Sequence, residues 1–305
     1  MAVRQFHGVF GPVTTPFDAR GDIDVAAFSQ NLATHIAAGL DGVVVNGSTG
    51  EAALLDEGER DRLLAAGRKA IGDRILIAGT GAESARLTID RCHRAAELGA
   101  DAVLVVAPHY YGDRMSPAAL KAHYERVANE SPIPVLLYNI PKYMHFRLEP
   151  ELVQQLAGHE NIVGMKDSAG DPECLARYVE AQDDGFSVLT GHGGTWQQAL
   201  ALGVRGGILA VALFAVELTL AVRDAMRQGK PDEAAELQAR LTPLALQIVG
   251  KLGVAGVKAA MDAVGLRGGL TRLPLLPLGA IEAERVRQLL AQSAALTATA
   301  GHVKS

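Results

Sequence analysis

The segments PVLLYNIP at residues 134–141 and IVGMKDSAG at residues 162–170 each contain a run of apolar residues. Both runs are nearly continuous, whereas a strand that is buried on only one face alternates apolar and polar residues. Continuous runs are typical of parallel strands that are buried on both faces beneath helices. Residues 149–156, between the two runs, have a helical pattern, so this region predicts a strand, a helix and a second strand.

The same alternation runs through most of the chain. The predicted strands cover residues 7–15, 42–47, 74–81, 102–108, 134–141, 162–168, 186–192 and 206–211. The predicted helices cover residues 24–38, 56–71 and 84–98, a segment that begins at Ser116, and residues 149–156, 172–181, 195–202 and 217–228. Eight such units with short connections predict an α/β fold, the (β/α)8 or TIM barrel.

We assign the barrel to residues 1–230. Residues 231–305 are rich in alanine and leucine, and we expect them to form a C-terminal helical extension of three helices packed on the barrel. A doubly wound open sheet is the rival architecture, but it would need a glycine-rich phosphate turn after its first strand. The segment GPVTTPF at residues 11–17 contains no such turn.

Composition and charge exclude several classes of protein. The chain has 305 residues, of which 49% are hydrophobic and 21% charged, and its net charge is -5. Because no basic cluster stands out, we expect no nucleic-acid partner. The first residues lack the pattern of a signal peptide, and the longest apolar stretch, residues 208–216, is too short to cross a bilayer. We therefore expect a cytoplasmic protein with no membrane partner.

In barrels of this type the active site lies at the carboxyl ends of the strands. The predicted strands end in, or are followed by, hydroxyl-bearing, aromatic or charged residues: Thr14 and Thr15, residues 46–51, residues 109–111, residues 138–141, residues 166–168, and Gly191 with His192. The sequence thus predicts a polar mouth above an apolar barrel.

Lys166 is the most informative of these residues, because it ends an apolar strand. The other lysines lie in predicted helices, loops or the C-terminal tail. Apolar surroundings favour the neutral form of an amine, and a neutral amine can attack a ketone to form a Schiff base. The protonated imine then stabilises a carbanion or enamine at the adjacent carbon. The structural alternative is a lysine that forms an ion pair with Asp167 or Glu51.

Tyr138 ends the strand that precedes the Lys166 strand. A phenol at this position can move protons to and from a carbinolamine on the lysine. The alternative is a half-buried aromatic residue whose hydroxyl group lies in water.

The segment GSTGE at residues 47–51 offers a second group of ligands. Its glycines allow a sharp turn and leave backbone N–H groups free, and Ser48 and Thr49 add hydroxyl groups. Together these groups can hold a small carboxylate. The alternative is an ordinary turn between a strand and a helix, in which Glu51 is at most an acid in the first turn of that helix.

His192 lies among three glycines, at positions 191, 193 and 194. Its place after the seventh strand suits contact with the distal end of a substrate. The glycines would also suit a phosphate, as barrels often bind one near their last two strands, with Arg205 as the nearest cation. The alternative is a histidine that is satisfied by backbone groups.

Taken together, these motifs resemble the dihydrodipicolinate synthase and N-acetylneuraminate lyase family of pyruvate-handling class I aldolases. The resemblance rests on GPVTTPF at residues 11–17, GSTGE at 47–51, YNIP at 138–141, GMKDSAG at 164–170 and RLPLLPL at 272–278, and it covers nearly the whole chain. It implies a (β/α)8 barrel with a C-terminal helical extension, a homotetramer built as a dimer of dimers, and catalysis without a cofactor or a metal ion.

The resemblance also implies a role for each motif residue. Lys166 would form the Schiff base with pyruvate or another 2-oxo acid, and Tyr138 would be the proton shuttle. Thr49 would relay protons between Tyr138 and a tyrosine donated across a subunit interface, which is Tyr110 in this sequence.

The remaining expected contacts are with the substrates. Ser48 and Thr49, with Gly47, would bind the carboxylate of the 2-oxo acid. Tyr143, Ser168 and His192 are expected to face the second substrate or the distal end of the first.

The sequence departs from the synthases of this family at one position. Those enzymes carry an arginine two residues after the proline of YNIP, whereas this chain has Tyr143 there, with Lys142 and Arg147 as the nearest possible substitutes. The stretch from residue 78 to residue 171 looks closer to the 4-hydroxy-2-oxoglutarate aldolase branch, which releases pyruvate and glyoxylate. Ser168 matches that branch, but Thr49 stands where it tends to have asparagine.

We therefore expect a Schiff-base lyase that makes or cleaves a carbon–carbon bond to pyruvate, with 4-hydroxy-2-oxoglutarate as the first candidate substrate. The alternatives are a dihydrodipicolinate synthase, which condenses pyruvate with aspartate semialdehyde, and a sugar-acid lyase such as N-acetylneuraminate lyase. Outside enzymes, the alternative is a barrel that binds a small acid without turnover.

Overall fold

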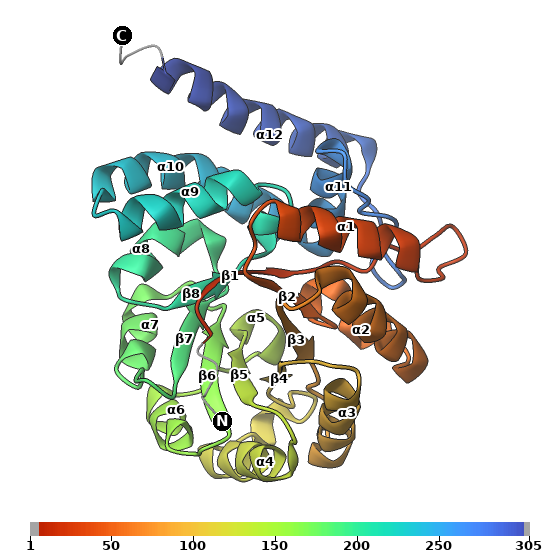
Figure 1. Cartoon of the computed structure of the whole chain (residues 1–305), viewed down its shortest axis with the longest axis vertical. Coiled ribbons are helices and arrows are strands. Elements are labelled where there is room, and N and C mark those ends of the chain that lie inside the picture. The colour runs from red at the N-terminus through yellow and green to blue at the C-terminus, as the bar shows by residue number, and fades with distance from the viewer. Residues whose placement is uncertain (1–5, 302–305) are drawn as a thin grey trace.

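The computed structural model describes residues 6–301, which form a closed barrel of eight parallel strands in chain order, with helices around it (Figure 1). The strands are β1 (Gly8–Pro12), β2 (Gly42–Val45), β3 (Ile75–Gly79), β4 (Ala102–Val106), β5 (Val135–Asn139), β6 (Ile162–Asp167), β7 (Ser187–Thr190) and β8 (Gly206–Ile208). Each lies within a predicted strand, so the prediction of a (β/α)8 barrel is confirmed. The strands are shorter than predicted because the flanking glycine, proline and polar residues form turns.

The helices of the barrel begin at the signals that the sequence contains. They are α1 (Val25–Ala37), α2 (Glu57–Ile71), α3 (Ala85–Glu97), α4 (Pro117–Glu130), α6 (Pro150–Ala157), α7 (Pro172–Val179), α8 (Trp196–Ala201) and α9 (Val216–Arg227). Asp24 and Ser116 are N-caps that accept backbone hydrogen bonds, and Asp56 forms a capping box with Glu59. The short helix α5 (Pro141–Met144) after β5 was not predicted.

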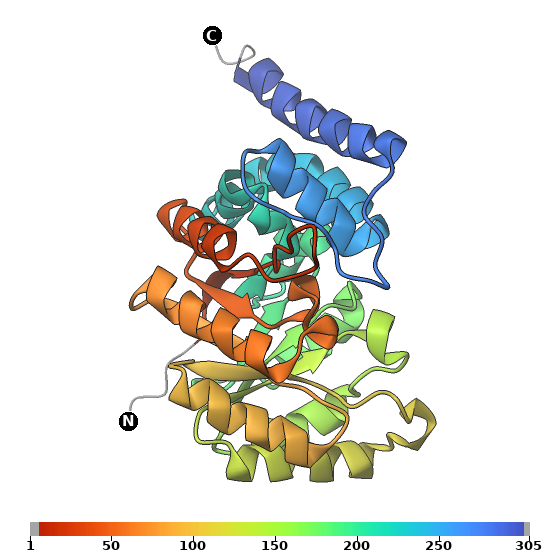
Figure 2. The same ribbon diagram turned by 90° about the vertical axis from the view of Figure 1, so that its right-hand side faces the viewer.

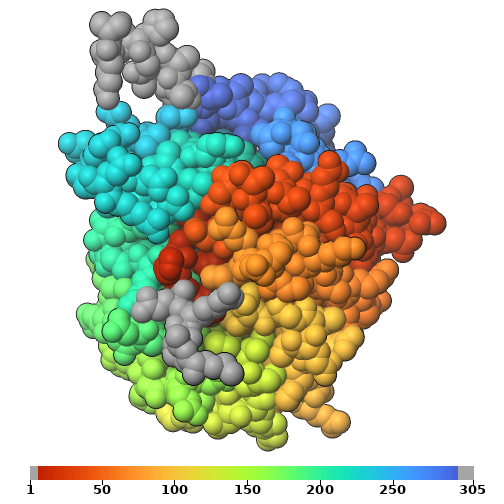
Figure 3. Space-filling view, in the orientation of Figure 1, coloured from red at the N-terminus to blue at the C-terminus, as the bar shows by residue number. Residues whose placement is uncertain are grey.

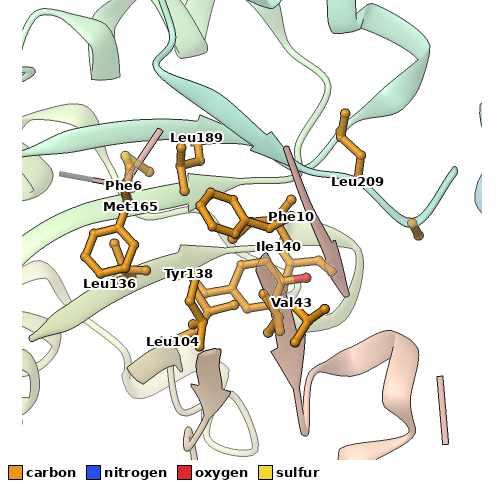
Figure 4. Packing of buried hydrophobic residues seen from close by; sticks show 14 of the residues in the cluster. Phe6, Phe10, Val43, Leu104, Leu136, Tyr138, Ile140, Met165, Leu189 and Leu209 are labelled. Atoms are coloured by element: carbon orange, nitrogen blue, oxygen red, sulfur yellow. The ribbon is translucent and has the colours of Figure 1, made fainter. Parts of the chain in front are cut away.

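Apolar side chains pack inside the barrel and between its strands and helices. Phe10, Val43, Leu136 and Leu189 are fully buried, and Figure 4 shows the ring of Tyr138 beside Val43 in the same cluster. Each large apolar side chain buried in this way contributes roughly 1.5–3 kcal/mol of transfer free energy. The packing holds the strand ends, and therefore the mouth, in a defined arrangement.

Further helices follow the barrel. They are α10 (Pro231–Pro243), a π-helical segment η6 (Leu244–Lys251), α11 (Gly253–Ala263) and α12 (Ala280–Gly301). Figure 3 shows these segments, coloured cyan to blue, covering one side of the barrel next to the red N-terminal segment. Within residues 6–301, no helix is both long and apolar enough to cross a bilayer.

The pairing of β5 with β6 sets the geometry of the mouth. After an irregularity between Val135 and Leu136, Tyr138 pairs with Lys166 and Asn139 pairs with Asp167. Side chains alternate along a strand, so residues at equivalent positions of adjacent parallel strands lie on the same face of the sheet. The register therefore places the Tyr138 and Lys166 side chains side by side.

Candidate active site

Lys166 and Tyr138 form a buried pair at the carboxyl ends of β6 and β5. The Lys166 Nζ atom lies 3.3 Å from the Tyr138 hydroxyl oxygen and 4.3 Å from the centre of its ring. Only 6% of Lys166 and 5% of Tyr138 is exposed. The amine is thus removed from bulk water and lies within reach of one proton-exchanging group, as a Schiff-base lysine requires.

The structural alternative for Lys166 does not hold. Asp167, on the opposite face of β6, accepts hydrogen bonds from the Asn139 amide at 2.7 Å and from the Ala169 N–H at 3.3 Å. Glu51 forms an ion pair with Lys258 at 2.5 Å. Among the described residues, no carboxylate forms an ion pair with Lys166, so its amine is not used in a structural salt bridge.

Gly191, the first residue after β7, leaves room for the lysine. A Cβ atom at this position would lie 2.7 Å from Lys166 Cε and 2.0 Å from Ser168 Oγ. Both distances are shorter than any ordinary contact between heavy atoms. The absence of a side chain at Gly191 therefore lets Lys166 and Ser168 pack against the end of β7.

The GSTGE loop begins directly after β2. Ser48 and Thr49 are half-buried and belong to the 3-10 helix η1 (Ser48–Gly50). The Thr15 hydroxyl donates to the Gly50 carbonyl at 2.7 Å, and a Cβ atom on Gly50 would lie 2.9 Å from the Val13 carbonyl oxygen. The loop is thus held against the end of β1, on the same rim of the barrel as Lys166.

Glu51 is not the first-turn acid that the sequence suggested. It is 3% exposed and has a left-handed backbone, with φ 57°. Its carboxylate pairs with Lys258 and accepts the Arg272 N–H at 2.9 Å. Lys258 is assigned no role from the sequence, where it is grouped with the lysines of predicted helices, loops and the C-terminal tail. Lys258 is far from Glu51 in the sequence, so no local pattern indicates this contact.

Tyr110 makes no hydrogen bond to Lys166 within the described part of the chain. It follows β4 in a loop whose backbone is held by Glu83, which accepts hydrogen bonds from the N–H groups of His109 and Tyr110, both at 2.9 Å. The Tyr110 side chain is 77% exposed, and its ring makes an edge-to-face contact with Tyr111. No hydrogen bond joins Thr49 to Tyr110 or to Tyr138 within residues 6–301.

Tyr143 lies near Tyr138. It lies on α5, and its pKa is raised by burial and, to a smaller extent, by the nearby Tyr138. Neither predicted substitute for the missing arginine is available. Lys142 donates to the Gly250 carbonyl at 2.9 Å, and Arg147 lies 3.6 Å from Asp171.

His192 lies on the rim beside β6. A Cβ atom on Gly170 would meet its ring at 2.8 Å, and its Nδ1 lies 3.1 Å from the Thr195 hydroxyl. It is therefore paired with a side chain rather than with backbone groups. Burial lowers the pKa of His192, which favours the neutral imidazole.

Arg205, the cation expected to bind a phosphate together with the glycines around His192, does not lie near them. Arg205 immediately precedes β8, at the amino end of the barrel, and donates to the Asp183 carbonyl at 2.7 Å. It is therefore at the opposite end from the mouth. The cation that the phosphate interpretation relied on is therefore not near His192, and burial favours the neutral form of His192 itself.

Behind the pair of Lys166 and Tyr138, a buried network joins the ends of β5 and β6. Burial raises the pKa of Asp167 to about 6, although its hydrogen bond from Asn139 opposes this shift. Asn139 also accepts the Leu148 N–H at 3.0 Å, and the Tyr178 hydroxyl donates to the Leu148 carbonyl at 2.5 Å. The asparagine of the YNIP motif thus acts as a structural bridge rather than as a substrate ligand.

Comparison with known proteins agrees with this geometry. The model of the dihydrodipicolinate synthetase family matches residues 5–293. A 4-hydroxy-tetrahydrodipicolinate synthase from Xanthomonas axonopodis pv. citri is 40% identical over 295 residues, which cover 95% of this chain and 96% of the relative.

Solved structures show the same fold. The 4-hydroxy-tetrahydrodipicolinate synthase from Methylacidiphilum fumariolicum SolV superposes with a TM-score of 0.91 at 29% identity, covering 99% of this chain and 100% of that one. YagE from E. coli K12, a prophage protein of the same family solved in complex with pyruvate, superposes with a TM-score of 0.88 at 30% identity, covering 94% and 98% of the two chains.

These matches extend over almost the whole chain, and they exclude a barrel that only binds a small acid. The buried pair of Lys166 and Tyr138, the loop after β2 and the common fold lead to one conclusion: the chain belongs to the dihydrodipicolinate synthetase family and is a pyruvate-dependent lyase of that family.

Proposed function

We propose that the protein condenses pyruvate with aspartate semialdehyde through a Schiff base on Lys166, as a 4-hydroxy-tetrahydrodipicolinate synthase. The observation that carries the chemistry is the buried Lys166 Nζ atom, 3.3 Å from the Tyr138 hydroxyl and free of any carboxylate in the described chain. The choice of aldehyde is supported by the relatives, which are named as this synthase. It replaces 4-hydroxy-2-oxoglutarate, the first candidate from the sequence.

The first step joins the Lys166 amine to the carbonyl carbon of pyruvate. The resulting carbinolamine loses water to form an imine, and this step needs a proton donor for the departing hydroxyl group. The Tyr138 hydroxyl is within hydrogen-bonding reach of the lysine nitrogen and supplies this proton.

In the second step the imine loses a proton from the methyl carbon of pyruvate and becomes an enamine. The enamine carbon attacks the aldehyde carbon, and a new carbon–carbon bond forms while the aldehyde oxygen takes up a proton. Ser48 and Thr49, on the rim after β2, hold the carboxylate of pyruvate during both steps. Ser168 and His192 face the arriving aldehyde from the rim after β6 and β7.

The test is to trap the imine. Pyruvate and borohydride should convert Lys166 into a stable secondary amine that mass spectrometry locates on its peptide. Lys166→Ala should give no adduct. Tyr138→Phe should still give some adduct but lose most turnover, because proton transfer contributes roughly 10²–10⁴-fold to such steps. An equal yield of adduct from Lys166→Ala would move the nucleophile elsewhere.

A second candidate, 4-hydroxy-2-oxoglutarate aldolase, is favoured by one observation. Tyr143 stands where the synthases have their arginine, and both Lys142 and Arg147 have other partners. Among the described residues, both candidates for the cation that would bind the carboxylate of aspartate semialdehyde are thus engaged elsewhere. A coupled assay should compare that aldehyde plus pyruvate with 4-hydroxy-2-oxoglutarate and with N-acetylneuraminate; turnover of 4-hydroxy-2-oxoglutarate alone would establish the second candidate.

We also propose that the enzyme is a cytoplasmic homotetramer in which Tyr110 completes the active site of a neighbouring subunit. Its high exposure, on a loop braced by Glu83, supports this role. Thr49 would then connect Tyr110 of one subunit with Tyr138 of the next.

A further inference from the structure

A buried ion pair joins the loop after β2 to the C-terminal extension. Glu51, the last residue of GSTGE, has one carboxylate oxygen 2.5 Å from the Lys258 ammonium of α11. Its other oxygen accepts the backbone N–H of Arg272 at 2.9 Å. Both side chains of the ion pair are almost completely buried, with exposed fractions of 2% for Lys258 and 0% for Glu51. The contact therefore lies in the interior and not on the surface.

Lys258 is held from several directions. Its ammonium donates to the Leu270 carbonyl at 2.6 Å and lies 4.6 Å from the centre of the Phe17 ring. On the same side, α11 reaches the end of β1, where the Thr14 hydroxyl lies 3.4 Å from Met261 Sδ. Figure 2 shows the chain between α11 and α12, in blue, passing beside the red N-terminal segment.

Arg272 extends the contact to the start of α2. Its guanidinium makes two hydrogen bonds to the Glu59 carboxylate, both at 2.6 Å, and it also donates to the Leu54 carbonyl at 2.7 Å. The segment from Glu51 to Glu59 is thus held at both ends by the extension. Such a fastening controls the conformation of the loop as well as its position.

Glu51 also has an unusual backbone conformation. Its φ of 57° lies in the left-handed region, which is strained for any residue with a side chain. Glu51 is also the residue that ends η1, because its N–H donates to the Ser48 carbonyl at 3.1 Å. A change at Glu51 would therefore alter the helix that carries the hydroxyl groups of Ser48 and Thr49.

A contribution to protein stability does not by itself explain the buried ion pair of Glu51 and Lys258. Burying two charges costs so much solvation free energy that buried ion pairs are often no more stabilising than apolar residues of the same size. Burial lowers the pKa of Lys258 while Glu51 opposes the shift, which reflects this balance. The geometric effect on the loop is the feature that an apolar pair would not supply.

We propose that Lys258 is a positioning residue for the pyruvate carboxylate. By holding Glu51 in its left-handed conformation, it keeps Ser48, Thr49 and the N–H groups of η1 aimed at the mouth. The C-terminal extension is then part of the active site, although it supplies no catalytic residue. This inference rests on the proposed function, because it assumes that the loop binds pyruvate.

The experiment measures how much pyruvate is needed to trap Lys166 with borohydride. Lys258→Met should raise the half-saturating pyruvate concentration about tenfold or more, the size expected when a hydrogen bond to a charged group is misaligned. The adduct yield at saturating pyruvate should stay close to that of the wild type, since Lys166 and Tyr138 are unchanged. A structural role alone would lower thermal stability and leave the half-saturating concentration unmoved.

Two further variants make the test specific. Arg68→Met removes an ion pair with Asp101 of 3.0 Å at the amino end of the barrel, and it should leave pyruvate binding unchanged. Lys258→Met combined with Glu51→Gly should recover most of the pyruvate affinity, because glycine adopts a positive φ without strain. Lys258→Arg replaces Lys258→Met in the test if the latter does not fold. It keeps the positive charge but alters the contact with Glu51, so a smaller increase in the half-saturating pyruvate concentration is expected.

The outcomes separate the two proposals. A wild-type protein that forms no adduct would refute the Schiff-base function and this inference with it. A normal wild-type adduct, with the same pyruvate dependence in folded Lys258 variants, would refute the inference alone. An increase in the half-saturating concentration that Glu51→Gly fails to reduce would also overturn it.

Discussion

Gly191 offers a direct test of how closely the lysine is held. In Gly191→Ala the new Cβ would lie 2.7 Å from Lys166 Cε and 2.0 Å from Ser168 Oγ. Carbon atoms in contact prefer about 3.5–4.0 Å, so the lysine stem must move by roughly 1 Å or the end of β7 must shift. Gly191 does not have a positive φ, so the added methyl group acts through these contacts and not through backbone strain.

The expected loss of activity follows from that displacement. A misplacement of about 1 Å in a reacting group costs on the order of 10²-fold in rate. Overpacking of a filled site costs about 1–3 kcal/mol of stability. Gly191→Ala should therefore remain folded, with kcat reduced about 100-fold and a free energy of unfolding reduced by about 1–3 kcal/mol.

Turnover is measured in the coupled assay and stability by urea unfolding. Gly158→Ala is the matched control, because Gly158 ends α6 with φ -74° and its nearest contact to an added Cβ is 3.5 Å; it should change neither quantity. Combining Gly191→Ala with Ser168→Gly removes the shorter clash, the one with Ser168 Oγ. Any loss of kcat that remains in the double variant is then due to the displacement of Lys166. A Gly191→Ala enzyme with kcat within about threefold of the wild type would refute the reasoning, since a displaced nucleophile costs far more.

Three other predictions follow from the structure. If Tyr110 acts across an interface, subunits of Lys166→Ala and Tyr110→Phe should recover activity when dissociated and reassembled together, whereas activity equal to the sum of the separate variants would argue against it. The pKa of Asp167 rises from 3.8 to about 6 on folding, so the folded state binds more protons than the unfolded state between these values and stability falls as pH rises through them. Asp167→Asn should lose this dependence. Measured by urea unfolding, its free energy of unfolding relative to that of the wild type should be about 3 kcal/mol higher at about pH 7 than at about pH 4. The same difference between the two proteins at both pH values would contradict this prediction. Tyr143→Arg should lower the KM for aspartate semialdehyde by about tenfold, the size of one hydrogen bond to a charged carboxylate, while the KM for pyruvate changes little; an unchanged KM for aspartate semialdehyde would show that residue 143 does not contact its carboxylate.

The strand that ends in Lys166 could be predicted because its signal is local. A continuous apolar run predicts burial on both faces wherever it occurs in the chain, and all eight runs became strands. The order of strands and helices then leaves few architectures, and the mouth of the barrel follows from the ends of the strands. Lys166 and Tyr138 were found in this way, since each is the last residue but one of its strand and the two strands are consecutive.

The other contacts of the site join residues that are far apart in the sequence. The pairing of Glu51 with Lys258, the close approach of Gly191 to Lys166 and the separation of Arg205 from His192 leave no local pattern. They depend on how α11, β7 and β8 pack against the rest of the barrel. Neighbouring residues determine whether a segment is a buried strand or a capped helix. The partner of a buried charge, in contrast, is determined only by the tertiary structure of the whole chain.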